Sequence, residues 1–371
     1  MKSYHGQLDY LREKCMPYDL NAPEFYLFGM GNRDKFIYKN FQLVNIENDS
    51  VVYSFGDAVS DSIIPDEYMV RVKTNTGYIV VYEDENGIWL QEGDRLDSLH
   101  SHYCHVILPD FAMKKFSKVL KVLHHEILFN IKDSQIYPNI LVYRKPFLRD
   151  AFMGALCLEQ TGNTNLLKSW IESINDIYDM QNGEEEPDNL GELLYLLTLI
   201  SPDSNLKVRH KLYEEIERKT VIDGNLKYIS GHTDGNDNAE YQTQILKYAL
   251  EKAGMKDSYT NARVPGFYYN LCWFTKGDNN KQTLRQLLDF WRYGDRDLPW
   301  PYLMWARAHY YGNFQAPFNA QNYPLSWEQN GESAFYDSMK KISSKAVDDK
   351  MCYPHVWSAA EMFLKLIQYE E

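Results

Sequence analysis

The pattern of apolar residues changes once along the chain, near residue 109, and this change limits the folds that the chain can adopt. Between residues 25 and 105, short β-branched or aromatic runs alternate with turn sequences such as Asp84-Glu85-Asn86-Gly87. After residue 109, apolar positions recur at helical intervals, and we expect no strand there. We therefore predict a β-rich N-terminal domain with a short leading helix at residues 1–108, and a helical domain at residues 109–371.

The helical part divides into segments separated by residues that stop helices. The predicted helices span 110–132, 146–161, 164–181, 187–201, 205–219, 239–253, 280–292, 299–312, 331–345 and 355–369. Four of them are apolar on all sides and begin at 146, 187, 299 and 355. Four others carry charge on one side and begin at 164, 205, 280 and 331. Because fully apolar helices are buried and striped helices lie outside, this alternation predicts an inner ring of helices wrapped by an outer ring.

Charge and cysteine usage limit the partners and the compartment. The formal net charge is -13 and the basic stretches are short, which argues against a nucleic-acid partner. The 5 cysteines are scattered and lack CxxC spacing, as expected for reduced thiols in the cytosol. The sequence also shows no signal segment and no uncharged run of membrane-spanning length. We therefore expect a cytoplasmic protein without a membrane partner.

Three short segments of the helical half are similar to those of a known enzyme superfamily. They are Arg149-Asp150, Trp327-Glu328-Gln329-Asn330-Gly331, and Pro354 to Glu361. With them, the chain resembles the six-hairpin, or (α/α)6-toroid, glycosidase superfamily, which includes glucoamylases and trehalases. The resemblance implies a mainly α fold, with an (α/α)6 toroid preceded by a small antiparallel β-rich domain. It also implies an inverting glycoside hydrolase, in which one carboxylic acid protonates the leaving oxygen and one carboxylate activates water.

The stretch from Gly183 to Leu190 concentrates four carboxylates around Pro187 at the start of an apolar helix. Capping is one interpretation, because acidic side chains at a helix N-terminus are each stabilising by about 0.3–1 kcal/mol. Catalysis is the other, because repulsion between neighbouring carboxylates can keep one of them protonated near neutral pH. We predict Glu186 as the catalytic acid, and Glu185 and Asp188 remain open as alternative carriers of the proton.

Two further segments offer carboxylates. Glu328 lies between a tryptophan and a polar Gln-Asn-Gly sequence, a setting suited to a bound water or sugar hydroxyl, and we predict it as the catalytic base. Its structural alternative is capping of the helix at 331. The polar loop from His232 to Gln242 contains Asp237 and Glu240, either of which could replace either catalytic partner.

Polar and aromatic residues near the starts of the apolar helices are predicted to bind substrate. The set is Arg149, Asp150, Asp188, Glu240, His232, Trp300, Trp327, His355 and Trp357. Structural alternatives stand beside these roles. Arg149 and Asp150 can form an ion pair, and aromatic residues at helix starts are often core residues.

We expect no cofactor and no metal. The sequence contains no Walker A loop, HExxH, GxSxG or strand-borne GxGxxG motif, which removes the commonest NTPase, zinc-protease, hydrolase and dinucleotide-binding interpretations. His100, His102 and Cys104 could share one strand face as metal ligands, but a polar linker between the two domains is the preferred interpretation.

Together these features predict a carbohydrate-active enzyme that hydrolyses an oligosaccharide or glycoside with paired carboxylates. Two alternatives remain open. One is a toroidal sugar isomerase, epimerase or lyase in which His232 and His355 move protons. The other is a non-enzymatic helical ring that binds a peptide or a partner subunit, because a fold does not determine a function.

Overall fold

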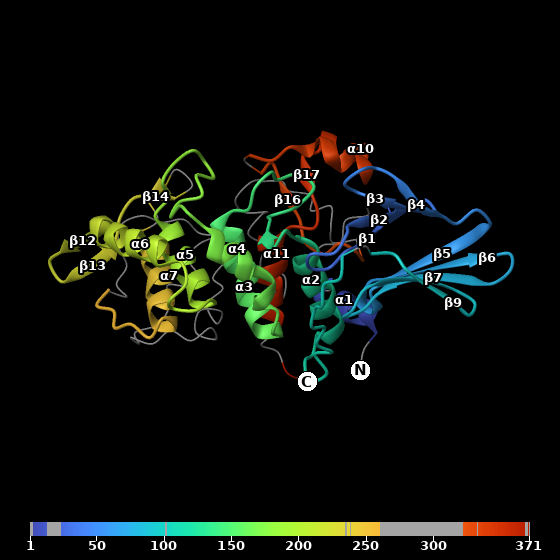
Figure 1. Cartoon of the computed structure of the whole chain (residues 1–371), viewed down its shortest axis with the longest axis horizontal. Helices are drawn as coiled ribbons and strands as arrows, with labels where there is room; N and C mark the ends of the chain where they lie inside the picture. Colours follow the sequence, from blue (N-terminus) through green and yellow to red (C-terminus); the bar gives the residue numbers. More distant parts are fainter. Residues whose placement is uncertain are drawn as a thin grey trace.

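The chain forms an elongated molecule with antiparallel sheets at one end and a row of helices extending from them (Figure 1). The computed structural model describes residues 3–12, 24–100, 102–233, 236–237, 239–259, 322–331, 333–367 and 370. A single cluster of buried apolar side chains runs from the sheets into the helices. None of the helices in these ranges has both the length and the apolar character that spanning a bilayer requires.

Two antiparallel sheets make up the N-terminal part, and each is a series of sequential hairpins. The first contains β1 (Tyr26–Phe28), β2 (Phe36–Lys39), β3 (Gln42–Asn45) and β4 (Val51–Ser54). The second contains β5 (Ala58–Ile64), β6 (Met69–Thr74), β7 (Tyr78–Glu83), β8 (Ile88–Glu92) and β9 (Arg95–Ser98). Burial alternates along β6 and β7, so that one face of the second sheet lies on the core.

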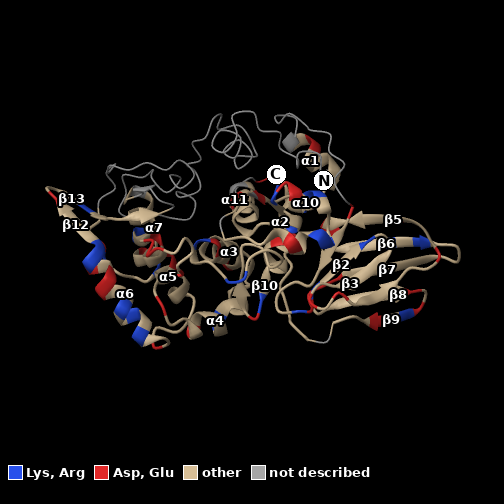
Figure 2. Ribbon diagram, turned by 90° about the horizontal axis from the view of Figure 1, so that it is seen from above, with Lys and Arg blue, Asp and Glu red and all other residues tan. Residues whose placement is uncertain are grey.

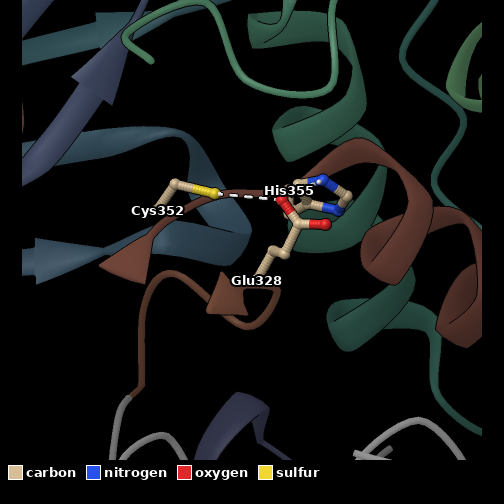
Figure 3. A group of neighbouring side chains, drawn as sticks. All are labelled: Glu328, Cys352 and His355. Atoms are coloured by element: carbon tan, nitrogen blue, oxygen red, sulfur yellow. Dashed lines mark hydrogen bonds and ion pairs between the residues drawn. The ribbon is translucent and has the colours of Figure 1, made fainter. Parts of the chain in front are cut away.

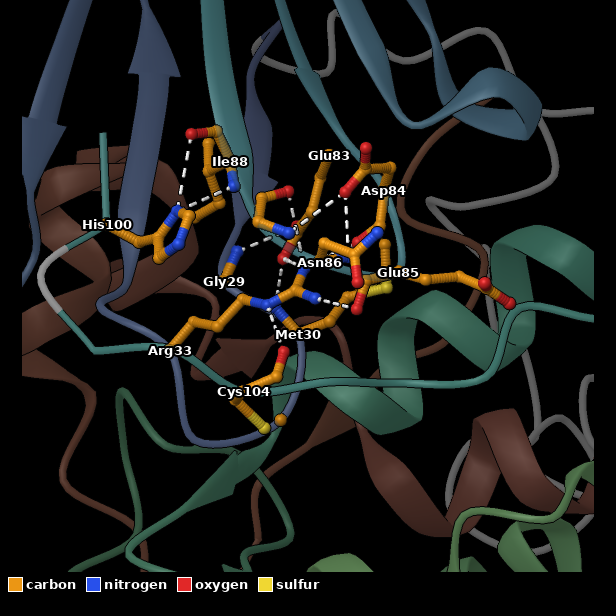
Figure 4. A network of polar contacts seen from close by, with 12 residues as sticks. Gly29, Met30, Arg33, Glu83, Asp84, Glu85, Asn86, Ile88, His100 and Cys104 are labelled. Carbon is orange, nitrogen blue, oxygen red and sulfur yellow. Dashed lines mark hydrogen bonds and ion pairs between the residues drawn. The ribbon is translucent and has the colours of Figure 1, made fainter. Parts of the chain in front are cut away.

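A buried ion pair fixes the loop between β1 and β2 against the second sheet (Figure 4). Arg33 Nη1 lies 2.8 Å from Glu83 Oε1, and both side chains are fully buried. The same carboxylate accepts hydrogen bonds from the backbone N–H groups of Gly29 and Met30 at 2.9 and 2.6 Å. A charge buried this deeply requires such partners, because the loss of one leaves the other unpaired at a cost of about 3–5 kcal/mol.

The remaining described residues form helices and short hairpins. The helices are α1 (Tyr4–Arg12), α2 (Ser117–Phe129), α3 (Leu148–Thr161), α4 (Lys168–Ser173), α5 (Asp188–Thr198), α6 (Leu206–Lys219), α7 (Ala239–Lys252), α10 (Ser344–Asp348) and α11 (Val356–Leu366). The 3-10 segments are η1 (Pro65–Glu67), η2 (Thr164–Leu167) and η5 (Tyr336–Lys341). The hairpins pair β10 (Ile131–Lys132) with β11 (Gln135–Ile136), β12 (Thr220–Asp223) with β13 (Leu226–Ile229), β14 (His232–Thr233) with β15 (Asn236–Asp237), and β16 (Glu328–Gln329) with β17 (Met351–Cys352).

The buried helices pack side by side in the order α2, α11, α3, α5 and α7 (Figure 1). The C-terminal helix α11 thus lies between two helices from the middle of the chain. Helix α6 covers α5 from outside and buries only Val208, Leu212 and Ile216, while its charged residues face solvent (Figure 2). For α3, α5 and α11, which are buried, and for α6, which is outer, the contrast between apolar and striped helices in the sequence therefore corresponds to burial.

The predicted (α/α)6 toroid, and with it the resemblance to the six-hairpin superfamily, is wrong. Of the described residues, about 38% are in helices and 22% in strands, so the class is mixed α/β and not mainly α. The described helices form a row and not a closed ring, and hairpins occur where we expected no strand. A helix that is buried on all sides is apolar on all sides whether it lies in a row or in a closed ring. The apolar pattern therefore predicted which helices are buried, but not that they would form a ring.

Two predicted helices are also interrupted. The segment 331–345 contains η5 and α10 instead of one helix, and Ser333 has a φ of 58°. The segment 164–181 is helical only as far as Ser173. The predicted helices at 280–292 and 299–312 lie outside the described residues.

Close packing of α5 against α7 depends on Gly191. A Cβ atom at this position would lie 2.6 Å from both Ile245 Cγ2 and the backbone nitrogen of Leu246. We expect Gly191→Ala to lower the free energy of unfolding by about 1–3 kcal/mol, because the backbone of α7 would have to move. Urea denaturation measures this. Gly56→Ala is the control, since a Cβ atom there meets no atom of the described residues within 4 Å, and an equal loss in both variants would contradict the expectation.

Candidate functional site

Side chains from four separate segments meet where α3 and α11 begin. Asp150 lies in the first turn of α3, and His355 is the N-cap residue of α11. Glu328 and Cys352 are directly opposite each other in the β16–β17 hairpin. Tyr143 comes from the loop before α3. Figure 3 shows Glu328, Cys352 and His355 pointing toward one another.

The imidazole of His355 contacts two carboxyl groups through one nitrogen atom. Its Nε2 atom is 3.2 Å from Glu328 Oε2 and 3.7 Å from Asp150 Oδ1. Glu328 Oε2 also accepts hydrogen bonds from the Tyr143 hydroxyl and, at 3.9 Å, from the Cys352 thiol. Asp150 Oδ1 is buried and has no hydrogen-bond partner among the described residues. The two carboxyl groups therefore have different surroundings although they contact the same ring nitrogen.

These surroundings move the two carboxyl pKa values in opposite directions. Burial alone would raise the pKa of Glu328, but the charge of His355 and the hydrogen bonds from His355, Tyr143 and Cys352 outweigh burial and lower it. Burial raises the pKa of Asp150 to about 6, against the opposing charge of His355. For His355, burial lowers the pKa, yet the nearby Glu328 and Asp150 raise it overall. Carboxyl pKa values that diverge in this way are typical of acid–base sites.

The segment that carries Glu328 is anchored to α2 by a buried carboxyl group. Glu126 accepts hydrogen bonds from the backbone N–H groups of Leu325 and Ser326 at 2.5 and 3.0 Å, and from the Ser326 hydroxyl. Ser326 Oγ in turn accepts a bond of 3.0 Å from the backbone N–H of His355. Glu126 thus fixes both Glu328 and His355 through the backbone.

Arg149, the neighbour of Asp150 in the chain, forms a second buried cluster with the carboxylates before α5. Its Nη2 atom lies 2.8 Å from Asp188 Oδ2 and 3.3 Å from Glu186 Oε2. All three side chains are almost fully buried. Arg149 therefore forms a buried ion pair, which was the structural alternative for this residue. Its partners, however, are Glu186 and Asp188 and not Asp150.

Comparison with known proteins returns no relative. No family model, curated protein or solved structure matches the chain.

The other predicted site residues lie elsewhere or in the core. Trp327 is buried in the core, and Trp357 packs half-buried against it. His232 is exposed on β14, where its backbone pairs with that of Asp237 on β15. Glu240 lies in the first turn of α7. Trp300 and the side chains of Asp237 and Glu240 lie outside the described part of the structure.

Cys352 and Glu126 are site residues that sequence reasoning missed. Cys352 precedes His355 by three positions, and this Cys-x-x-His spacing was the available signal. For Glu126 there was none, because a glutamate inside a helix is usually a solvated residue.

Among the described residues, Glu328, Cys352 and His355 could hold a metal ion, since their ligand atoms all lie within 4.8 Å of one another. The histidines considered from sequence have other contacts. His100 Nδ1 accepts a hydrogen bond from the backbone N–H of Ile88 at 3.0 Å, and His102 Nδ1 lies 3.1 Å from Asp34 Oδ1. These two imidazoles serve separate local contacts.

Proposed function

We propose that the protein hydrolyses glycosidic bonds in an oligosaccharide or glycoside. Asp150 is the proton donor, and Glu328 is the ionised carboxylate that activates water or stabilises positive charge on the sugar ring. One observation carries the proposal: two carboxyl groups from distant segments contact the same atom, His355 Nε2, at 3.7 and 3.2 Å. A pair of Asp and Glu carboxyl groups is the usual machinery for cleaving a glycosidic bond.

The hydrogen bonds support this division of roles. Three donors surround Glu328 Oε2, and donors stabilise the ionised form of a carboxyl group. The buried Asp150 Oδ1 has no such donor in the described part of the chain, and burial without donors favours the protonated form. Asp150 would therefore protonate the leaving oxygen, while Glu328 would activate water or stabilise positive charge on the sugar ring. About 28% of the Glu328 side chain is exposed, which leaves it accessible to a substrate.

The geometry favours hydrolysis over the isomerase or lyase alternative. That reaction would need an unprotonated imidazole as a base, but His355 faces two carboxyl groups, which favour its protonated form. His232, the other residue considered for this role, is exposed on β14 and belongs to a different hairpin.

Screening aryl glycosides and short oligosaccharides for released sugar tests the proposal. We expect the wild type to cleave at least one substrate, and Glu328→Gln to lower kcat by a factor of about 10²–10⁴. Glu185→Gln is the matched control, because this side chain is 57% exposed and lies 3.8 Å from the exposed Arg218. Wild-type turnover by Glu328→Gln, or no cleavage of any sugar, would refute the proposal.

A further inference from the structure

The acid–base cluster also has the composition of a metal site. It contains one thiol, one imidazole nitrogen and carboxylate oxygens, which are the donor types that zinc prefers. The ligand atoms of Glu328, Cys352 and His355 lie within 4.8 Å of one another (Figure 3). They come from two elements that the fold fixes, the β16–β17 hairpin and the N-terminus of α11.

The distances suit a shared tetrahedral ion. Ligand atoms bound to one zinc at about 2.0–2.3 Å are roughly 3.3–3.8 Å apart. Glu328 Oε2 is 3.2 Å from His355 Nε2 and 3.9 Å from Cys352 Sγ. Both separations are therefore within a few tenths of an ångström of those expected in a zinc site.

Asp150 is an independent indication of a missing partner. Its side chain is almost fully buried, and Oδ1 has no hydrogen-bond partner within the described ranges, although buried oxygen atoms nearly always have one. This atom lies 3.7 Å from the ring nitrogen that would bind the metal. Asp150 is not among the residues whose ligand atoms all lie within 4.8 Å of one another, so its carboxyl group would lie beside the ion and could bind a water held on it.

The surroundings of His355 also favour binding through Nε2. Ser358 Oγ lies 3.4 Å from Nδ1, on the far side of the ring. Histidine ligands commonly have such a partner on the second nitrogen, which orients the ring.

We propose that Glu328, Cys352 and His355 form a zinc site beside Asp150, and that zinc bound there inhibits the enzyme by occupying the carboxylate of Glu328. Binding replaces the protons of the Cys352 thiol and the His355 imidazolium, so these protons are released to solvent. The inhibitory effect rests on the proposed hydrolase function, whereas zinc binding itself does not.

Calorimetry with ZnCl₂ on chelator-treated protein tests binding. We expect one zinc per chain with a dissociation constant in the micromolar range or below, and a loss of affinity of at least tenfold in both Cys352→Ser and His355→Gln. Co²⁺ is the second probe, because a thiolate ligand adds an absorption band that Cys352→Ser would remove. Cys157→Ser is the matched control, since Cys157 is equally buried but lies in the middle of α3. Circular dichroism shows whether each variant is folded.

Two results would overturn the zinc site: no saturable binding to the folded wild type, or unchanged binding and an unchanged cobalt band in folded Cys352→Ser. Inhibition is measured separately, as loss of glycoside cleavage that a chelator reverses. Retained cleavage with zinc bound would refute inhibition. If zinc binds through Cys352 but no sugar is cleaved under any condition, the hydrolase proposal fails and the metal site stands.

Discussion

Asp150→Asn is expected to slow the cleavage of oligosaccharides by a factor of about 10²–10⁴ while having a much smaller effect on activated aryl glycosides. A sugar leaving group needs a proton as the bond breaks, and the amide that this substitution introduces could not donate one in the way that a carboxylic acid does. A nitrophenolate leaves without protonation, so it does not depend on the acid. The measurement compares kcat/KM for two substrates that share a glycone and differ only in the leaving group.

Glu328→Gln provides the contrast, because the carboxylate acts on water or on the sugar ring and not on the leaving group. We expect it to slow both substrates to a similar degree. If Asp150→Asn also slowed both substrates equally, Asp150 would not be the proton donor. If the two variants showed the reverse pattern, the roles of Asp150 and Glu328 would be exchanged.

Helix positions could be predicted from sequence because the helical period is a local signal. The predicted helix at 146–161 corresponds to α3 at Leu148–Thr161, and the one at 239–253 to α7 at Ala239–Lys252. The arrangement of the helices could not be predicted in the same way. Helix α11 inserts between α2 and α3, which are roughly 200 residues or more earlier in the chain, and no local pattern encodes such a neighbour.

The candidate site was predicted in part for a similar reason. Asp150, Glu328 and His355 were singled out because they lie at or before the starts of predicted helices, and the fold brings them together. Their division of roles depends on contacts that only the folded chain defines. Glu186 was the preferred acid from sequence, but Arg149 pairs with it in the folded chain, and the carboxyl group that is buried without a hydrogen-bond partner in the described structure is Asp150.

Glu126→Ala is expected to lower the free energy of unfolding by about 3–5 kcal/mol, the largest stability effect that we predict. The substitution removes the acceptor of two buried backbone N–H groups, each of which costs about 1–3 kcal/mol when left unpaired. It also leaves a cavity in α2. Urea denaturation measures the loss. Glu67→Ala is the control, since this residue is exposed at the end of η1, and a comparable loss in both variants would contradict the anchoring role of Glu126.

Glu126 should also make stability depend on pH. Burial raises its pKa to about 8 in the folded protein, against an ordinary value of 4.5. Between these two values the folded state holds a proton that the unfolded state has lost. The stability that this contributes is therefore complete below pH 4.5, declines as the pH rises, and is lost once the pH has passed through 8.

The variant Glu126→Gln isolates this effect, because its amide side chain cannot titrate. The stability of the wild type relative to Glu126→Gln should fall between about pH 5.5 and 8, by at most about 1.4 kcal/mol per pH unit. Urea denaturation of both proteins across this range measures the difference. Taking the difference cancels the contribution of groups that titrate alike in the two proteins, such as Lys35, whose pKa burial lowers to about 7. A difference that stayed constant would mean that Glu126 is ionised throughout, and that its hydrogen bonds to Leu325 and Ser326 outweigh its burial.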